Sequence, residues 1–456
     1  MSVQSTTTLQ KLARQTLMRN EAVIMSSLEE LPTVLFPALF KEAFEGSHNK
    51  LLKEMVATWP FPCFPVGALM KTPNLETLQA VLEGVDMRLT RNIHHRGKLQ
   101  VLDLRNVHYT FWNIWADEED GSCSSETLDD NPVVKVLPRY ALRHKLKVVT
   151  ELCLMPHLEK AQAYFLKWAQ QRKGFLHFCC TKLKIWAMPM DFIREILNVF
   201  HPEHIEQLEL NTEWNVFQLA HFAPFFGQMR NLCKLLLAPL YKNVFKIANR
   251  TGEREDKCVK GFISMFLKFN CLQHLSLSGV HFLRDHMNQV FDSFSCCQSL
   301  FHLKHLEMSS VTLSALDIMP LRSLMEKVAD NLQTLDLQGC RMKDYQLNAL
   351  LPALTRCSQL VKINFYNNDF SMAILKDFLH TANWGKINVE QPAPLECYDE
   401  LAHVCRERFA QLCQELMDTL GTIRQLKSIP FATNMCHKCG KQCVYGRENR
   451  TCSCQL

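Results

Sequence analysis

The chain has 456 residues, of which 47% are apolar and 21% are charged, and this balance excludes an intrinsically disordered protein. At about 150 residues per domain, the length allows about three domains or one large repetitive domain. Lysine and arginine total 51 against 46 aspartate and glutamate residues, and a net charge of +5 is too small to indicate a surface that coats nucleic acid. Glycine is scarce, and neither G-x-G-x-x-G nor G-x-x-x-x-G-K occurs, which disfavours nucleotide-dependent enzymes.

The chain contains 20 cysteines in two groups. Fifteen are scattered between Cys63 and Cys413, and five lie in the last 21 residues. The N-terminus lacks the apolar core of a secretion signal, and no run reaches the 18 apolar residues that a membrane span needs. We therefore expect reduced thiols, no contact with membranes, and a location in the cytoplasm, with the nucleus as a second location. Scattered cysteines such as Cys179, Cys180 and Cys340 are expected to be small core residues rather than nucleophiles.

Changes in pattern along the chain predict three regions. Residues 1–96 are expected to form an N-terminal helical cap, and residues 97–390 a repetitive domain. An acidic run at residues 117–130, rich in glycine and serine, is expected to be a solvated loop of that domain. The third region, residues 391–456, has proline-rich turns, an amphipathic helix at 401–420 and a cysteine-rich tail.

The repetitive domain is defined by the pattern Leu, two residues, Leu, one residue, Leu. Its clearest copies begin at Leu272, Leu303, Leu332 and Leu360. Their spacings of 31, 29 and 28 residues lie at or slightly above the range of about 20 to 29 for leucine-rich repeats. Weaker copies begin at Leu99, Ile205 and Leu232. The 40-residue gap between Leu232 and Leu272 predicts an insertion, which we place at the polar residues 241–260.

Each repeat is expected to supply one strand and one covering helix. Alternation at the second and third leucines makes a short strand with one buried face. Residues 344–354 show the helical half, since their leucines recur at i, i+3, i+4 and i+7, and Ser371 is expected to cap the next helix. The predicted fold class is therefore α/β: a leucine-rich repeat solenoid, or horseshoe, with a parallel sheet on the concave side and helices on the convex side.

Several stretches resemble one family of leucine-rich repeat proteins. They are residues 31–40 (LPTVLFPALF), 98–105 (KLQVLDLR), 179–190 (CCTKLKIWAMPM), 350–352 (LLP) and 436–440 (CHKCG). On these stretches the chain is identified as PRAME-like, similar over essentially its whole length to the preferentially expressed antigen in melanoma. The resemblance implies an adaptor without a catalytic site that recruits target proteins to a cullin-2 ubiquitin ligase through elongin B and elongin C. It also implies proteins that favour proliferation and restrain differentiation, apoptosis and transcription.

The adaptor role that the resemblance implies requires an elongin-binding segment, and we expect it near the N-terminus. An elongin-binding helix places Thr-Leu at its start, a cysteine four residues after the leucine and an aliphatic residue four further on. Thr16 and Leu17 match the start and Met25 the end, whereas Glu21 stands in place of the cysteine.

A cullin-2 motif of the form apolar-Pro-x-x-apolar-x-x-x-apolar follows. It is matched by Leu31, Pro32, Leu35 and Leu39, with the proline suited to the first turn of a helix. An alternative interpretation remains open, in which this apolar helix only docks onto the open end of the solenoid.

Substrate recognition in this adaptor is expected on the concave strand face, where side chains alternate with the buried leucines. The residues expected to form this surface are His274, Ser276, His305, Glu307, Thr334, Asp336, Lys362, Asn364 and Tyr366. Stacked strands would arrange them as a mixed polar column that can bind a protein segment by hydrogen bonds and charge complementarity.

The tail carries the one metal-site candidate that we identify in the sequence. Cys436 and Cys439 form a C-x-x-C pair, and Cys452 and Cys454 can complete four thiolate ligands for a structural zinc. An oxidisable tail without metal is the alternative.

A ligase-independent scaffold or transcriptional corepressor is the alternative function. Leu-x-x-Leu-Leu motifs of the kind that bind nuclear receptors begin at Leu232 and Leu347, but their leucines are expected in the repeat core. We expect no catalytic residues, since no histidine adjoins a serine or cysteine in a nucleophile turn.

Overall fold

The structure is a computed structural model whose residues fall into two compact units. It describes residues 9–70, 74–90, 97–116, 145–211, 216–238, 252–279, 286–313, 316–381, 387–400, 403–422, 429–436, 441–446 and 450. The first unit comprises Met1–Leu152, His157–Thr181 and Phe192–His201, and the second comprises Cys153–Pro156, Lys182–Asp191 and Pro202–Leu456. The boundary falls within strand β4 (His177–Trp186), and each unit is described by itself.

The first unit combines helices with a short parallel sheet. Its helices are α1 (Leu9–Met18), α2 (Glu21–Ser27), η1 (Thr33–Leu35), α3 (Phe36–Glu45), α4 (Asn49–Ala57), η2 (Val66–Ala68), α5 (Leu75–Thr90), α6 (Tyr109–Ala116), α8 (Lys160–Gln171) and most of α9 (Met190–Val199). Strands β1 (Cys63–Phe64), β2 (Val101–Asp103) and β3 (Lys147–Leu154) pair in parallel. The core is strongly aromatic, since the Phe40 ring lies 4.8 Å from that of Phe64 and 5.6 Å from that of Trp59, measured between centroids.

The second unit is a repeat solenoid, and its strands follow the end of β4 in chain order. They are β5 (Gln207–Asn211), β6 (Lys234–Leu237), β7 (His274–Ser276), β8 (His305–Glu307), β9 (Thr334–Asp336), β10 (Lys362–Asn364), β11 (Asn388–Pro392), β12 (Phe431–Ala432) and β13 (Val444–Tyr445). Neighbouring strands are parallel except β12 and β13, which form an antiparallel pair.

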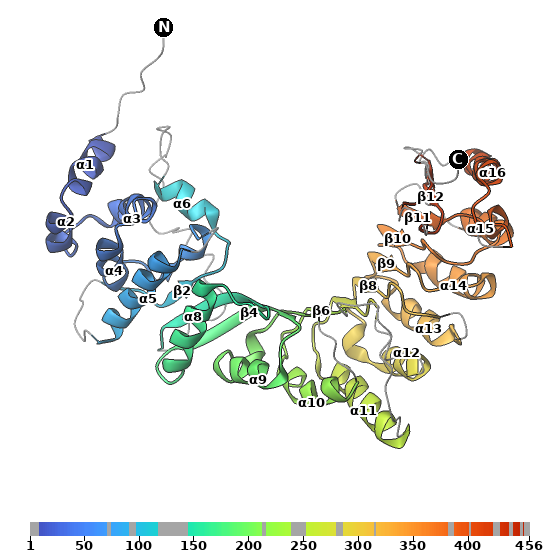
Figure 1. Cartoon of the computed structure of the whole chain (residues 1–456), viewed down its shortest axis with the longest axis horizontal. Helices are drawn as coiled ribbons and strands as arrows, with labels where there is room; N and C mark the ends of the chain where they lie inside the picture. The colour runs from blue at the N-terminus through green and yellow to red at the C-terminus, as the bar shows by residue number, and fades with distance from the viewer. Residues whose placement is uncertain are drawn as a thin grey trace, which may run out of the picture. The chain divides into compact units, whose positions relative to one another are not determined.

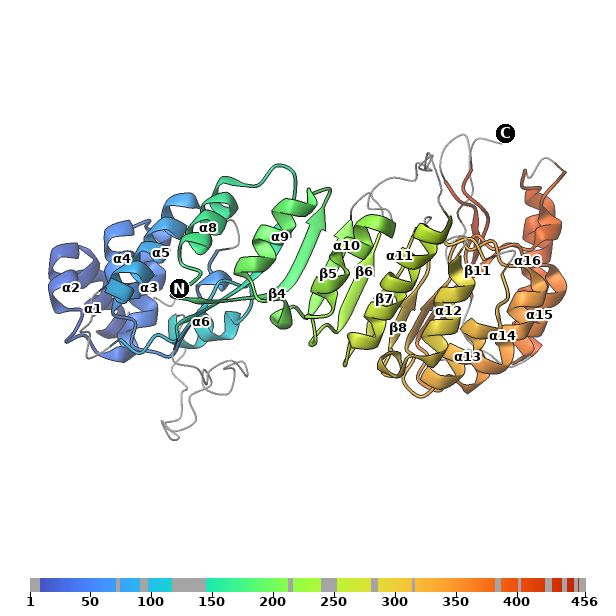
Figure 2. The ribbon, with the colours of Figure 1, turned by 90° about the horizontal axis from the view of Figure 1, so that it is seen from below.

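Helices of the second unit cover one face of these strands. They are η3 (Pro202–His204), α10 (Val216–Phe226), α11 (Gly252–Met265), η4 (Phe266–Lys268), α12 (Met287–Cys296), η6 (Gln298–Leu300), α13 (Met319–Val328), α14 (Asp344–Arg356), α15 (Met372–Thr381), η8 (Leu395–Cys397) and α16 (Arg406–Thr422). Within this unit, Figures 1 and 2 show the strands as the inner layer of the curve and helices α10 to α15 as the outer layer. The predicted fold class is therefore confirmed.

The register of the sheet follows the leucine pattern. Leu275 lies opposite Leu306, Leu306 opposite Leu335, and Leu335 opposite Ile363, and all four side chains are fully buried. Because side chains alternate along a strand, this buried column places the residues between the leucines on the opposite face.

The helical halves of the repeats also agree with the predictions. Helix α14 begins at Asp344, and its Leu347 and Leu350 are fully buried, which places the Leu-x-x-Leu-Leu motif in the repeat core. Helix α15 follows Ser371, whose hydroxyl oxygen accepts a hydrogen bond from the backbone N–H of Ile374 at 3.4 Å. Of the range 241–260 where an insertion was expected, residues 252–260 belong to α11, and residues 241–251 lie outside the described residues.

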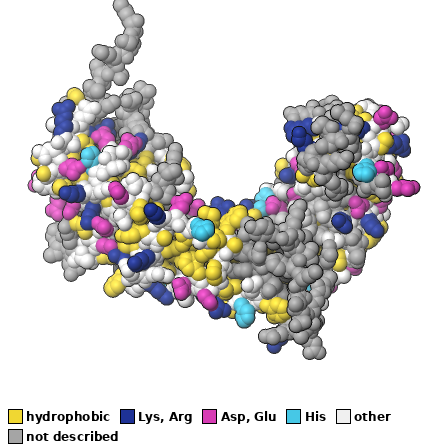
Figure 3. Space-filling model, in the orientation of Figure 1, with side chains coloured by type: hydrophobic (Ala, Val, Ile, Leu, Met, Phe, Trp, Pro, Cys, Tyr) yellow, Lys and Arg dark blue, Asp and Glu magenta, His cyan; other side chains and the backbone are white. Residues whose placement is uncertain are grey.

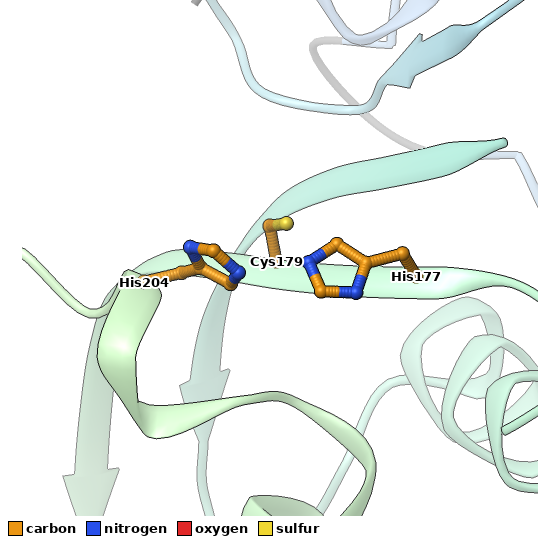
Figure 4. A group of neighbouring side chains, drawn as sticks. All are labelled: His177, Cys179 and His204. Atoms are coloured by element: carbon orange, nitrogen blue, oxygen red, sulfur yellow. The ribbon is translucent and has the colours of Figure 1, made fainter. Parts of the chain in front are cut away.

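Of the scattered cysteines that were expected in the core, the structure describes some as buried, among them Cys179, Cys180 and Cys340, whereas Cys153, Cys233, Cys258 and Cys271 are half-buried and Cys405 is exposed. Cys179 and Cys180 are fully buried in β4, and Cys179 packs with Cys63, Val101 and Val149. His177 lies two residues before Cys179 and on the same face of the strand (Figure 4, which also draws His204 of η3). Burial raises the pKa of the Cys340 thiol to about 12, so this thiol stays protonated at neutral pH.

Two further expectations were a solvated acidic loop and the lack of a membrane span. The acidic run at residues 117–130 lies outside the described residues. Among the helices that the structure describes, none combines the length and the apolar character that crossing a bilayer requires.

Candidate protein-binding surfaces

The face of the second unit's sheet opposite its described helices carries two rows of side chains that are polar except for Leu236. The first, here named the lysine–histidine row, consists of Lys182, Gln207, Lys234, His274, His305, Thr334, Lys362 and Asn388, each in register with the next. The second, named the carboxylate row, lies two residues further along each strand and consists of Lys184, Glu209, Leu236, Ser276, Glu307, Asp336, Asn364 and Glu390. The surface therefore presents two parallel stripes, one with cationic groups and the other with four carboxylates.

One histidine–carboxylate contact joins the two rows near the centre of the sheet. His274 Nε2 lies 3.2 Å from Glu307 Oε1, and the rings of His274 and His305 approach to 5.1 Å between centroids. His305 Nδ1 lies 3.0 Å from the Thr334 hydroxyl oxygen. Three neighbouring strands thus hold the two histidines in fixed positions.

Asp336 organises the next part of the carboxylate row. Its carboxylate accepts hydrogen bonds from the Ser309 hydroxyl at 3.1 Å, the Asn364 side-chain amide at 3.0 Å and the Gln338 backbone N–H at 3.0 Å. Asn364 is buried and also donates to Gln338 Oε1 at 3.1 Å. The network is satisfied within the protein, so the surface is organised before any partner binds.

The electrostatic environment favours the charged form of two carboxylates in the row, Glu209 and Glu307. The hydrogen bond with His274 lowers the pKa of Glu307 and outweighs burial. Burial opposes ionisation of Glu209, but hydrogen bonds from Lys184 and Asn211 lower its pKa overall. His305 behaves in the opposite way, since burial and the nearby His274 lower its pKa and favour the neutral ring.

All nine residues expected on this surface lie on the uncovered side of β7 to β10 or directly after it. Eight belong to the two rows, and Tyr366 follows β10, where burial raises the pKa of its hydroxyl to about 12. The two rows also include residues of β5, β6 and β11 that were not predicted from the sequence, among them Glu209, Lys234 and Glu390. The weaker leucine copies contained the signal, because Glu209 and Lys234 follow their first apolar residue at the same offsets as Ser276 and His274.

The elongin-motif residues of the first unit lie on two helices rather than one. Thr16 and Leu17 belong to α1 and Met25 to α2, and Asn20 between them caps α2 by accepting a hydrogen bond from the Val23 backbone N–H at 3.4 Å. Thr16 is exposed, whereas Leu17 and Met25 are half-buried.

Glu21, which occupies the cysteine position of the elongin motif, has a structural contact of its own. Its carboxylate pairs with the His48 ring at the start of α4. The side chain therefore links α2 to α4 within the first unit.

The cullin-motif residues divide between core and surface. Leu39 is fully buried in α3 and Leu31 is 6% exposed, while Leu35 is half-buried. Pro32 is exposed and precedes the short η1 helix instead of standing in the first turn of an α-helix. Val34 of η1 is 47% exposed, so Pro32 and Val34 are the apolar groups that this segment offers to a partner.

The structure describes one of the four cysteines that were predicted to bind zinc in the tail, Cys436. Strands β12 and β13 form a hairpin, and between them the Cys436 N–H donates to the Lys441 carbonyl at 2.9 Å. Cys439, Cys452 and Cys454 lie outside the described residues.

Comparisons with known proteins agree with the resemblance found in the sequence. The PRAME N-terminal domain matches residues 6–112, and the PRAME C-terminal domain matches residues 146–294 and 291–454. The chain belongs to the PRAME family. Human PRAME family member 8 is 40% identical over 482 residues, covering 100% of both chains. Mouse preferentially expressed antigen in melanoma-like protein 7 is 38% identical over 98% of both chains, and mouse oogenesin-3 is 37% identical over 97% of this chain and 93% of its own.

Proposed function

We propose that this PRAME family protein is a substrate adaptor of a cullin-2 ubiquitin ligase and performs no chemistry itself. In this proposal the segment from α1 to η1 binds elongin C and cullin-2, and the two polar rows of the second unit bind the target protein. The observation that carries the target-binding part is the pair of oppositely charged rows on the sheet face opposite the helices. Figure 3 shows cationic and anionic side chains interspersed over the described surface of the second unit, which favours selection by charge pattern.

The geometry of the rows defines the kind of target. Adjacent strands lie about 4.8 Å apart, so the rows extend roughly 30 Å from β5 to β11. An extended segment of about nine residues covers that distance. We expect it to place acidic side chains against the lysine–histidine row and basic side chains against the carboxylate row.

The ligase-binding part rests on the order and exposure of the N-terminal motifs. Thr16 and Pro32 are exposed, and Leu12 and Val23, on α1 and α2, are 48% and 49% exposed. Exposed apolar side chains on short helices are the groups that a partner's apolar pocket can take up. Because the motif is divided at Asn20, elongin C would contact two helices.

Co-purification from cells tests this part of the proposal. The tagged full chain is expected to bring down elongin B, elongin C and cullin-2, and the double substitution Leu17→Ala with Pro32→Ala is expected to reduce their recovery roughly tenfold or more, as for loss of a well-buried leucine contact. Phe175→Ala is the matched control, since Phe175 is 71% exposed in the same unit and outside both motifs. No recovery of elongin by the intact chain, or full recovery by the double variant, would contradict the proposed contacts.

A ligase-independent scaffold or transcriptional corepressor is the second candidate. It is favoured by the burial of Leu31 and Leu39, which gives half of the cullin motif a role in the core. If the double variant unfolds instead of selectively losing elongin, this second function is preferred.

We also propose a structural zinc in the cysteine-rich tail. The described feature that supports it is the position of Cys436, which follows β12 and donates its N–H to the Lys441 carbonyl at 2.9 Å, ahead of β13. Protein purified without chelator is expected to contain about one zinc per chain, and Cys436→Ser to contain much less. Cys405→Ser, which removes an exposed thiol outside the tail, is the control.

A further inference from the structure

Two half-buried cysteines of the second unit lie against each other on adjacent repeats. Cys233 Sγ and Cys271 Sγ are 3.6 Å apart, although 38 positions separate them in the sequence. Cys233 directly follows Leu232 and Cys271 directly precedes Leu272, the first leucines of two successive repeats. The pair therefore connects the two ends of the longest repeat, which contains α11.

Cys271 occupies the position before the first leucine of its repeat, and in other repeats the residue at this position forms a hydrogen bond to the preceding repeat. The residue before the first leucine is asparagine in two other repeats, where Asn231 donates to the Glu203 carbonyl at 2.8 Å and Asn331 to a carbonyl of the preceding repeat at 3.2 Å. Cys271 Sγ lies 3.8 Å from the equivalent carbonyl, that of Arg230, and 3.7 Å from the Leu232 carbonyl. A thiol is a weak donor at these distances, so Cys271 replaces the strong asparagine hydrogen bond with weak contacts. Cysteine in place of asparagine at this position puts a second sulfur beside Cys233.

We propose that Cys233 and Cys271 form a redox-active dithiol that a hydroperoxide converts into a disulfide between adjacent repeats. The Cys271 thiolate attacks the hydroperoxide, so that an S–O bond forms, the O–O bond breaks and the hydroxide that leaves is protonated to water. Cys233 sulfur then attacks the sulfenic sulfur, so that the S–S bond forms, the S–O bond breaks and a second water leaves with the Cys233 proton. Two thiols lose two electrons in total, and hydrogen peroxide is reduced to two waters.

The surroundings of the two sulfurs fit this order of events. Burial raises the pKa of the Cys233 thiol to about 11, and the adjacent Cys271 sulfur adds to the shift. Cys233 also donates to the Asn231 carbonyl at 3.3 Å, which keeps it in the thiol form. The carbonyl contact of Cys233 is shorter than the 3.7 and 3.8 Å contacts of Cys271, so we assign Cys271 as the sulfur that reacts first and Cys233 as the one that resolves the sulfenic acid.

The pair differs from Cys340 and Cys357, two other thiols of the repeats, in its access to solvent. Cys340 is fully buried and Cys357 is 5% exposed, so a soluble oxidant does not reach them in the folded chain. Cys233 and Cys271 are both half-buried. In a reducing compartment the disulfide would be transient, and it would tie the ends of the α11 repeat together only during oxidation.

Peptide mapping of the oxidised full chain tests the proposal. Reduced protein is treated with hydrogen peroxide, its remaining thiols are alkylated, and the unreduced digest is analysed by mass spectrometry. The peptide joining Cys233 to Cys271 is expected to be roughly tenfold more abundant than any other cysteine-linked peptide, because its sulfurs are held in contact. Dithiothreitol should remove it. Dominance of another cysteine pair, or free thiols at both positions after oxidation, would overturn the proposal.

Single substitutions separate the two roles. Cys233→Ser is expected to leave a sulfenic acid on Cys271 that dimedone labels, whereas Cys271→Ser should give little label on Cys233. Cys258→Ser, which removes a half-buried thiol of α11, should leave the linked peptide unchanged. Equal dimedone labelling of the two single variants would contradict the assigned order, and a linked peptide lost in Cys258→Ser would contradict the assigned pair.

Discussion

The repeats of the second unit and the motif segment of the first unit use apolar residues in different ways. In β7 to β10 the apolar side chains are buried in one column, and the residues that we propose to contact a partner are the polar ones between them. In the segment from α1 to α3 the motif residues include both core groups, such as Leu39, and exposed ones, such as Pro32. Under the proposed function, binding and folding would therefore use different residues on the sheet but overlapping residues within the N-terminal motifs.

The largest expected effect tests whether Leu39 belongs to the core as firmly as a repeat leucine does. Leu39→Ala in α3 and Leu335→Ala in β9 each remove a fully buried side chain and should each lower the free energy of unfolding by about 2–5 kcal/mol. Denaturant unfolding of each variant measures this. Pro32→Ala, at an exposed position, is the control and should cost much less. If Leu39→Ala leaves the free energy of unfolding unchanged, Leu39 does not contribute to the core, and the comparison with Leu335 fails.

A smaller effect is expected from the polar network on the sheet. Asp336→Ala leaves the Asn364 amide and the Ser309 hydroxyl without their acceptor, and it should destabilise the protein by about 1–3 kcal/mol. Asp336→Asn keeps one acceptor oxygen and should lose less. If thermal unfolding shows no difference between Asp336→Ala and the unchanged chain, the carboxylate row is not organised in advance as we describe.

The smallest effect is a pH dependence centred on His305. Its pKa is lowered in the folded state by burial and by His274, so the unfolded chain binds this proton more readily. Stability from this group is present above pH about 6.5 and is lost as the pH falls below it. Glu307, whose pKa is also lowered, acts in the same direction at lower pH, through its ordinary value near 4.5.

Unfolding measured between pH 7.5 and 5.5 checks this sign. The His305→Gln variant is expected to show a shallower loss of stability than the unchanged chain, because it removes a group that resists protonation when folded. His302→Gln, at an exposed position in the same repeat, is the matched control. A steeper loss in His305→Gln would mean that the histidine gains its proton on folding and that the assigned environment is wrong.

The contrast between the repeats and the N-terminal segment also explains which parts of the structure could be predicted from the sequence. The strands and the buried column were predictable because Leu275, Leu306 and Leu335 recur with one spacing, and the partner-facing residues follow from alternation. The register across β5 and β6 was predictable from the copies that begin at Ile205 and Leu232 but was not drawn, whereas β11 has no copy of the leucine pattern. The contact of Cys233 with Cys271 was hidden by the long repeat between them, whose path no local pattern defines.

The N-terminal segment was less predictable for a physical reason. A docking motif and a core helix both require apolar residues at helical spacing, so sequence alone did not separate Leu39, which is buried, from Pro32, which is exposed. The break at Asn20 was also missed, although asparagine is a preferred N-cap residue and signals a helix start.

The most direct test of the account is one partner-binding experiment, with proteasome inhibition, on two variants. In the first, Leu17→Ala and Pro32→Ala change the ligase-binding segment; in the second, Lys234→Glu and Lys362→Glu reverse the charge of the lysine–histidine row, with Lys257→Glu plus Arg356→Glu as the helix-face control. We predict that the first variant loses elongin and cullin-2 but keeps target proteins, and that the second loses target proteins but keeps elongin. Loss of both sets of partners in either variant, or of neither in both, would contradict the proposed division of functions.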